Sequence, residues 1–241
     1  MPNFNSTLLP GVRLKEFEII RILGIGGFGI TYLARDIRLG REVAIKEYFP
    51  VGFATRSGEQ TISARSEQHV GDYRWGLASF IGEARTLARF DHPSIVRIIR
   101  FFEANGSAYI VMEYIVGHSL SDELKEKQTL PEHRVKEIVN ALLDGLEQTH
   151  AEDLLHRDIK PGNVMLREDG RPVLIDFGAA RSIAGQHSRT MTAVLTPGYA
   201  PIEQYGSQGK QGPWTDIYSL GALAYKCLSG KTPQDLSLIH I

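Results

Sequence analysis

The sequence reads HRDIKPGN at residues 156–163, which places an acid, basic groups and an amide within a few residues of one another. A proline and a glycine inside this stretch disfavour a regular helix, so the polar side chains are expected on a stiff loop. Asp158 can accept a proton, Lys160 can face a migrating anion, and Asn163 offers a neutral oxygen. The stretch therefore predicts a reaction site rather than an ordinary surface loop.

The composition is that of an ordinary globular protein, with 42% hydrophobic residues and a net charge of −1 over 241 residues. This charge argues against a strongly basic nucleic-acid-binding protein. The single cysteine, Cys227, excludes an intramolecular disulfide and is expected to be a small buried residue on a helix. A membrane-spanning helix needs about 18 consecutive apolar residues, and no stretch of the sequence approaches this length. No signal peptide is visible either, so a cytoplasmic location is expected.

The first part of the chain reads as β-strands. Segments rich in Ile, Val, Tyr and Phe and broken by glycines predict strands over 17–24, 29–36 and 42–49. The polar stretch 51–72 shows little periodicity and predicts a loop, and helical spacing follows over 75–90. The apolar face of this helix is expected to contain Leu77, Ile81, Ala84, Leu87 and Ala88.

The second part of the chain is mainly helical, after two strands within 94–115 that meet at Asn105-Gly106, a strong hairpin signal. Thr129 and Glu132 have the spacing of a capping box. Short strands are expected near 163–166 and 172–177. A last helix should run from about Thr215 to a stop at Gly230. The helix that follows Thr129 should bury Val135, Ile138, Val139, Leu142, Leu143 and Leu146. The last helix should bury Leu220, Leu223, Ala224, Cys227 and Leu228.

These patterns predict an α+β protein with a small antiparallel β lobe that contains one helix and a larger, mainly α lobe. The N-terminal extension is expected over 1–16, the small lobe over about 17–112, a hinge at 113–117 and the larger lobe over 118–241. A ligand is expected in a cleft between the lobes.

The segment GIGGFG, residues 24–29, is a weak signal by itself because several folds use such glycines. A dinucleotide-binding turn would need a helix to begin after the last glycine. Ile30, Thr31 and Tyr32 follow instead, so the chain is expected to continue as a strand. A glycine hairpin whose backbone lies over phosphates fits this pattern, and a glycine turn without a ligand is the alternative.

Two further charged residues follow apolar strands. Lys46, in VAIK, needs a charged partner if it is buried, and Glu83 on the predicted helix is the best candidate. The alternative is an edge lysine with its ammonium group in water. Asp176, in IDFG, offers a carboxylate suited to Mg²⁺, with Asn163 as a second oxygen ligand.

Taken together, these segments resemble the protein kinase family, and specifically the eukaryotic-like (Hanks-type) serine/threonine kinases of bacteria. The resemblance covers about residues 17–233 and rests on the order of the parts: glycine loop, VAIK, helix glutamate, HRD-x-K-x-x-N, DFG and TPGYAPIEQY. It implies a bilobal kinase fold and transfer of the γ-phosphoryl group of ATP to Ser or Thr hydroxyls of proteins.

The resemblance also implies roles for individual residues. Asp158 would orient and deprotonate the attacking hydroxyl, and Asn163 and Asp176 would hold Mg²⁺, with Mn²⁺ as an alternative. Lys160 resembles the lysine that marks Ser/Thr specificity, and Thr196 matches the threonine of the substrate-binding loop. The expected nucleotide contacts are Leu23, Gly24, Gly26, Gly27, Phe28, Gly29, Thr31, Ala44, Lys46, Glu83, Met112, Glu113, Ile115 and Met165.

Packing and regulation follow from the same resemblance. Leu87, Ile98, His156 and Phe177 are expected to stack across the lobes, seated on Asp216. His156 is thereby interpreted as a packing residue. Phosphorylation within 179–195 would order that segment through Arg157, and a flexible polar loop is the alternative. The candidate hydroxyls there are Ser188, Thr190 and Thr192, which a transient dimer would phosphorylate.

The sequence also departs from the family pattern. Thr31 stands where valine is usual, and PIE at 201–203 replaces Ala-Pro-Glu. The chain ends before the remaining family helices, which predicts a C-terminally truncated domain with exposed apolar helix faces, in a parent protein that a later segment could anchor to a membrane. A pseudokinase that binds nucleotide as a scaffold, and a small-molecule kinase, are the alternative functions. No nucleic-acid partner is expected.

Overall fold

The protein, represented by a computed structural model, is described for residues 7–58, 60–177, 195–206 and 209–236. The chain forms two compact units. The small unit comprises Met1–Arg89 and Arg97–Tyr114, and the large unit comprises Phe90–Val96 and Ile115–Ile241. Each unit has its own sheet and its own helices.

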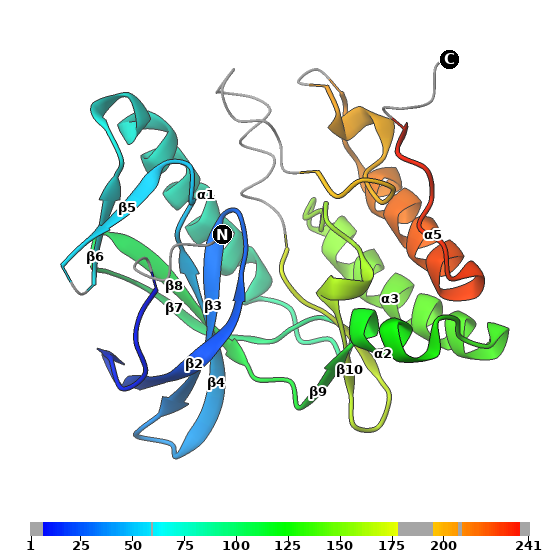
Figure 1. Cartoon of the computed structure of the whole chain (residues 1–241), viewed down its shortest axis with the longest axis horizontal. Helices are drawn as coiled ribbons and strands as arrows, with labels where there is room; N and C mark the ends of the chain where they lie inside the picture. Colours follow the sequence, from blue (N-terminus) through cyan, green and yellow to red (C-terminus); the bar gives the residue numbers. More distant parts are fainter. Residues whose placement is uncertain (1–6, 59, 178–194, 207–208, 237–241) are drawn as a thin grey trace. The chain divides into compact units, whose positions relative to one another are not determined.

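The small unit is built on a six-stranded antiparallel sheet with the order β1-β2-β3-β4-β8-β7 (Figure 1). The strands predicted over 17–24, 29–36 and 42–49 are confirmed, and Asn105-Gly106 forms the predicted turn between β7 and β8. Apolar and β-branched side chains cover the buried face of these strands, which favours a pleated sheet. The strands are β1 (Arg13–Leu14), β2 (Phe17–Ile25), β3 (Gly29–Asp36), β4 (Arg41–Tyr48), β7 (Ile98–Ala104) and β8 (Ser107–Glu113).

A two-stranded hairpin corrects the prediction of a loop over 51–72. Strand β5 (Ala54–Ser57) pairs antiparallel with β6 (Thr61–Ala64), and Gly58 adopts a φ of 60° in the turn. Ala54 and Ile62 are buried while most of their neighbours are not. The strands were missed because so few of their side chains face the interior that the polar composition concealed the alternation.

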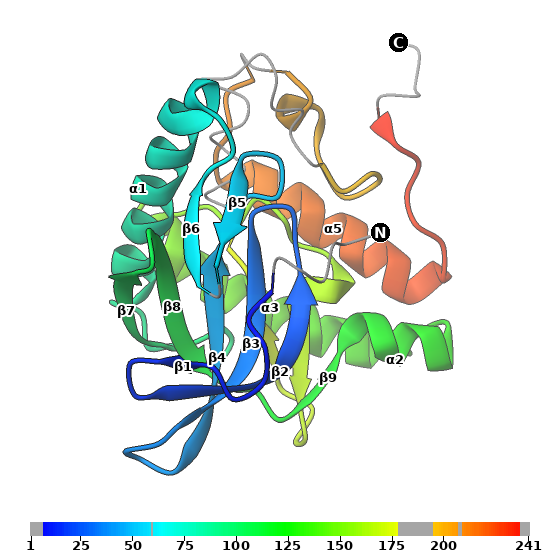
Figure 2. The same cartoon turned by 60° about the vertical axis from the view of Figure 1, so that its left-hand side comes forward.

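Helix α1 (Val70–Leu87) follows the hairpin and begins before the predicted residue 75. A 3₁₀ turn at Glu67–His69 leads into it. Ile81, Ala84 and Leu87 are buried as predicted, whereas Ala88 is exposed because it caps the end of the helix. Figure 2 shows α1 running beside β7 and β8, which its residues contact.

The described part of the large unit contains the α-helices α2, α3 and α5 and an antiparallel sheet of order β11-β10-β9. Helices α3 and α5 pack together (Figure 1), and the short helix α2 had not been distinguished in the sequence. The helices are α2 (Leu120–Lys127), α3 (Glu132–Ala151) and α5 (Pro213–Ser229). The strands are β9 (Gly117–Ser119), β10 (Val164–Arg167) and β11 (Pro172–Leu174).

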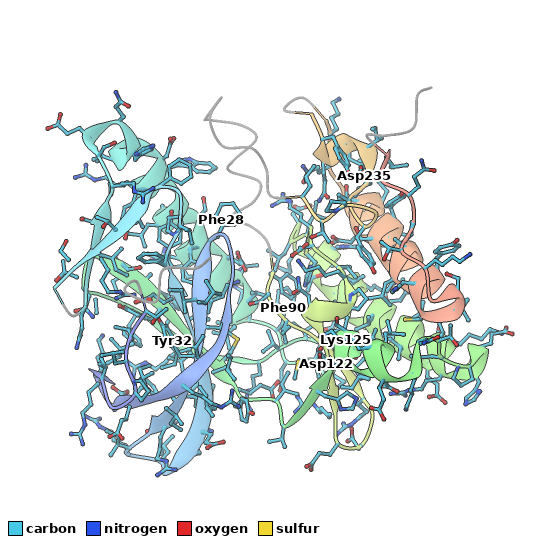
Figure 3. All side chains as sticks on the ribbon, in the orientation of Figure 1. Phe28, Tyr32, Phe90, Asp122, Lys125 and Asp235 are labelled. Carbon is cyan, nitrogen blue, oxygen red and sulfur yellow. The ribbon has the colours of Figure 1, made fainter. Side chains whose placement is uncertain are left out.

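The predicted capping box of Thr129 and Glu132 is wrong. Pro131 is the N-cap of α3, with no side-chain capping bond, and the Glu132 carboxylate instead lies 2.7 Å from Lys136 Nζ. Helix α2 is capped by a side chain, because Ser119 Oγ accepts from the backbone N–H of Asp122 at 3.1 Å. An exposed ion pair between Asp122 and Lys125, 2.8 Å long, continues this turn (Figure 3).

The apolar faces of α3 and α5 are confirmed in their centre and wrong at their margins. Ile138, Leu142, Leu146, Leu220, Leu223 and Cys227 are buried. Leu143 and Leu228 were predicted to face inward but are 37% and 48% exposed. Two other large apolar residues of α5, Trp214 and Tyr225, are also exposed, at 58% and 50%. Helix α5 ends at Gly230 with a φ of 71°, as predicted. Within the described ranges, no helix is long and apolar enough to cross a membrane.

Candidate active site

The loop of residues 156–163 is anchored on Asp216, a fully buried residue in the first turn of α5. Its Oδ2 accepts from the backbone N–H of His156 at 2.8 Å and its Oδ1 accepts from that of Arg157 at 2.7 Å. His150 of α3 adds a contact of 2.8 Å to Oδ2. Burial alone would raise the pKa of Asp216, but these hydrogen bonds and the nearby histidines hold it below its ordinary value. The charged carboxylate thus fixes the start of the loop, and it is the residue on which His156 was predicted to be seated.

His156 is a packing residue, as predicted. Its ring lies 4.5 Å from that of Phe177, its Nε2 lies 3.0 Å from the carbonyl oxygen of Ile175, and its Nδ1 accepts from the N–H of Asp158 at 3.2 Å. One nitrogen accepts while the other must donate, so the arrangement requires the neutral ring. Complete burial accordingly lowers the pKa of His156. Stacking with Leu87 and Ile98 stays a prediction.

The Asp158 carboxylate, only 8% exposed as a residue, is held on both oxygens. Oδ1 accepts from the Thr196 hydroxyl at 2.8 Å, and Oδ2 accepts from Asn163 Nδ2 at 2.8 Å. Lys160 Nζ lies 3.0 Å from Oδ2 and donates to Thr196 Oγ1 at 3.2 Å. Four residues singled out in the sequence therefore meet at one carboxylate, although Thr196 lies far along the chain from the others.

Polar residues on the buried face of α5 also position the segment that carries Thr196. Ser219 Oγ donates to the carbonyl oxygen of Tyr199 at 2.8 Å, and Thr215 Oγ1 donates to Glu203 Oε1 at 2.8 Å. The Gln204 amide in turn donates to the carbonyl oxygen of Arg157 at 3.0 Å. The sequence interpretation missed the roles of Thr215, Ser219 and Gln204. The available signal was the spacing of four between the polar residues Thr215 and Ser219 on a largely apolar helix.

Asn163 and Asp176, the predicted metal ligands, lie on neighbouring backbone segments. The N–H of Ile175 donates to the carbonyl oxygen of Asn163 at 3.0 Å. Both side-chain bonds of Asn163 use Nδ2, so its Oδ1 is the atom suited to a hard cation. Asp176 adopts a φ of 58° between Ile175 and the buried Phe177. An amide oxygen and a carboxylate in this arrangement fit a divalent cation that keeps other ligands from water or phosphate.

The glycine segment of the small unit is a strand-turn-strand, as predicted, and not the strand-to-helix turn of a dinucleotide site. The N–H of Gly26 donates to the carbonyl oxygen of Gly29 at 2.8 Å across the turn. The tip is tied to the chain after β4, because Phe49 donates to Phe28 O at 3.0 Å and Val51 to Gly27 O at 3.1 Å. The turn is thus held by backbone contacts beside an exposed Leu23 and Gly24.

Four predicted nucleotide contacts share one face of the small unit's sheet. Thr31 is paired with Lys46, and Ala44 is paired with Met112, on adjacent strands. Glu83 on α1 is 6% exposed, and Lys46 is half-buried. Pairing of Lys46 with Glu83 stays a prediction.

The remaining predicted residues divide between the units or fall outside the described ranges. Glu113 ends β8 in the small unit, whereas Ile115 and Met165 belong to the large unit. Ser188, Thr190 and Thr192 lie outside the described residues.

Comparison with known proteins places this arrangement in a family. Residues 17–237 match the family described as protein kinase domain. The serine/threonine-protein kinase PknA of Nostoc sp. is 36% identical over 231 residues, covering 92% of this chain and 38% of that protein. PknB of Mycobacterium leprae is 35% identical over 224 residues, covering 90% of this chain and 33% of that protein.

A solved structure described as the apo form of PpkA-294 has 42% sequence identity and a TM-score of 0.85, covering 95% of this chain and 81% of that chain. The chain spans about two fifths of the length of the curated relatives it matches first, at 38%, 39% and 41%. The bilobal kinase fold is confirmed by this likeness, and the chain belongs to the protein kinase domain family.

Proposed function

We propose that this domain is a serine/threonine protein kinase that transfers the γ-phosphoryl group of ATP to protein hydroxyls. The observation that carries the proposal is the Asp158 carboxylate, which is held by Asn163, Lys160 and Thr196 at 2.8–3.0 Å. A carboxylate fixed on both oxygens can orient an acceptor hydroxyl without reorganising during the reaction.

In the proposed reaction, the acceptor oxygen bonds to the γ-phosphorus, and the bond from that phosphorus to the bridging oxygen of ADP breaks. The hydroxyl proton passes to Asp158, and the electron pair of the broken bond leaves with ADP. Because the Lys160 ammonium group lies 3.0 Å from the same carboxylate, it would also lie near the phosphoryl group in transfer and would stabilise its negative charge. Loss of a general base typically lowers such a rate by about 10²–10⁴-fold.

The nucleotide is proposed to contact the small unit along the face that carries Thr31, Ala44, Lys46 and Met112. The glycine hairpin at 24–29 would lie over the phosphates, since its backbone carries few side chains. Mg²⁺ is the proposed cation, with Mn²⁺ as an alternative, because the ligand set of Asn163 and Asp176 supplies only oxygen. When bound, the cation would neutralise charge on the phosphates.

Protein hydroxyls are the proposed substrates, including those of Ser188, Thr190 and Thr192 in another copy of the chain. Thr196, which donates to Asp158, and Lys160, which donates to Thr196, are the proposed determinants of Ser and Thr acceptors. A transient encounter between two copies would bring one segment to the other copy's Asp158.

The test is phosphate transfer from radiolabelled ATP to a generic basic protein, with Asp158→Asn compared with the unchanged chain. The substituted amide keeps the shape of the side chain but cannot act as a base, so transfer should fall by about 10²-fold or more. Nucleotide binding, measured by calorimetry, should survive. The matched control is Asp169→Asn, an exposed aspartate in the β10–β11 turn that binds Arg171. Transfer by Asp158→Asn at the control's rate would refute the proposal.

A further inference from the structure

The strand that carries Lys46 presents its next residue to the opposite face of the sheet. Because side chains alternate along a strand, Lys46 and Tyr48 share one face of β4, and Glu47 points to the other. Glu47 is an acid with no solvent exposure. Its Oε2 accepts from the Tyr32 hydroxyl at 2.9 Å and from Arg56 at 2.5 Å. Figure 3 labels Tyr32 within this sheet. A buried carboxylate needs such partners, because burial without them is costly.

Arg56 comes from β5, in the hairpin that the sequence did not predict. Its side chain is 2% exposed, and besides Glu47 it donates to the carbonyl oxygen of Gln60 at 3.1 Å. Its guanidinium lies 5.4 Å from the centre of the Phe49 ring. The β5–β6 hairpin is therefore attached by an internal ion pair to the face of β4 opposite Lys46.

The same hairpin holds the turn between β7 and β8. The N–H of Ile62 donates to the carbonyl oxygen of Asn105 at 2.8 Å, and Asn105 Nδ2 donates to Gln60 Oε1 at 3.1 Å. Gly106 follows with a φ of 74°, and a Cβ at this position would overlap the carbonyl oxygen of Ile62. Only glycine allows the two backbones to approach this closely.

Helix α1 also binds the Asn105-Gly106 turn. The Tyr73 hydroxyl donates to the carbonyl oxygen of Gly106 at 2.8 Å, and the Tyr48 hydroxyl donates to the carbonyl oxygen of Tyr73 at 3.2 Å. The Tyr48 ring lies 5.3 Å from that of Tyr73 and 5.5 Å from that of Phe80. At Gly76, a Cβ would overlap the Tyr48 hydroxyl. Burial raises the pKa of Tyr48 and of Tyr73, so both hydroxyls remain protonated donors.

We propose that the β5–β6 hairpin is a built-in positioning element for the reaction, with Arg56 as its positioning residue. The hairpin fixes β4 from the face opposite Lys46 and fixes α1, which carries Glu83, through the Asn105-Gly106 turn. The inference rests on the proposed function, because Lys46 and Glu83 are assigned to the nucleotide there. All of its contacts lie within the small unit.

The experiment compares two variants of the whole chain with the unchanged protein. Tyr73→Phe removes the hydroxyl that joins α1 to the turn. The paired variant Glu47→Gln with Arg56→Met removes the ion pair without leaving one buried charge uncompensated. Amide hydrogen exchange over residues 70–87 should accelerate on the order of fivefold in each, the effect of losing about one hydrogen bond. The value of kcat should fall on the order of tenfold, and by a larger factor than KM for ATP rises.

Two controls separate positioning from general stability. Thr86→Val removes an α1 hydroxyl whose bond, 3.2 Å to the carbonyl oxygen of Gly82, stays within the helix, and should leave kcat and α1 exchange unchanged. Arg56→Lys keeps a cation facing Glu47 and should recover part of the kcat lost in the paired variant. Faster exchange without a fall in kcat would overturn the positioning role, and so would unchanged exchange. If the unchanged chain transfers no phosphate, the proposed function fails, and the exchange measurement alone then decides whether the hairpin holds α1.

Discussion

Arg157 donates its backbone N–H to Asp216 Oδ1 at 2.7 Å while its own φ is 63°, in the left-handed region. A residue other than glycine held in this conformation costs on the order of 1–3 kcal/mol and persists only where the surroundings fix it. Asp216 supplies that fixation, because it holds two consecutive N–H groups immediately before Asp158. The geometry of the candidate base thus depends on a carboxylate from a distant helix.

We expect Asp216→Ala to lower the free energy of unfolding by about 3 kcal/mol. The substitution leaves the buried N–H groups of His156 and Arg157 without their acceptor, and each such loss costs about 1–3 kcal/mol. Urea unfolding followed by circular dichroism measures the change. The control is Asp169→Ala, whose exposed pair with Arg171 should contribute less than about 1 kcal/mol. Equal losses in the two variants would contradict the anchoring role of Asp216.

Gly29→Ala should destabilise the small unit, because the new Cβ would lie 2.5 Å from the carbonyl oxygen of Glu47 on the adjacent strand. A backbone atom cannot rotate away, so β3 and β4 must separate locally, at about 1–3 kcal/mol. Gly82→Ala is the matched control, since its Cβ meets nothing within 4 Å on a helix. There the same change should stabilise by about 0.5–1 kcal/mol. Thermal unfolding of both variants gives the comparison, and a shared sign would show that the close approach at Gly29 is unimportant.

The sequence predicted the elements that have a marked apolar composition or a helical period. The strands at 17–24, 29–36 and 42–49 are rich in Ile, Val, Tyr and Phe, and the centres of α3 and α5 are buried at helical spacing. The β5–β6 hairpin shows neither signal, because its composition is polar and only a few of its side chains are buried. The capping box failed because helix α3 begins later than the box requires: Pro131 is the N-cap, so Glu132 is the first helical residue and not the third. Spacing alone does not say at which residue the helix begins.

The site was predictable in its residue types and less so in its supports. Motif order identified Asp158, Lys160, Asn163 and Thr196, whose side chains meet in the structure. Ser219 and Arg56 were missed because their partners, Tyr199 and Glu47, are fixed by tertiary packing and not by a sequence period. A buried polar side chain becomes interpretable only when its partner is known.

His156 should make the stability of the protein depend on pH just below neutrality. Burial lowers the pKa of His156 in the folded protein, whereas the unfolded chain binds a proton near the ordinary value of 6.5. Between the two pKa values the unfolded state therefore holds the extra proton. The stabilisation is fully present above pH 6.5 and is lost as the pH falls below it, by up to about 1.4 kcal/mol per pH unit.

The measurement is the free energy of unfolding in urea at several pH values between about 7.5 and 5.5, the range below the ordinary histidine pKa. His156→Gln should show a smaller slope against pH than the unchanged chain, whatever its absolute stability, since its side chain does not titrate. His133→Gln, at an exposed position of α3, should keep the original slope. If His156→Gln shows the same slope as the His133→Gln control, the buried imidazole takes up its proton in the folded protein as readily as in the unfolded chain. That outcome would contradict the neutral ring, which must accept from the N–H of Asp158 and donate to the carbonyl oxygen of Ile175.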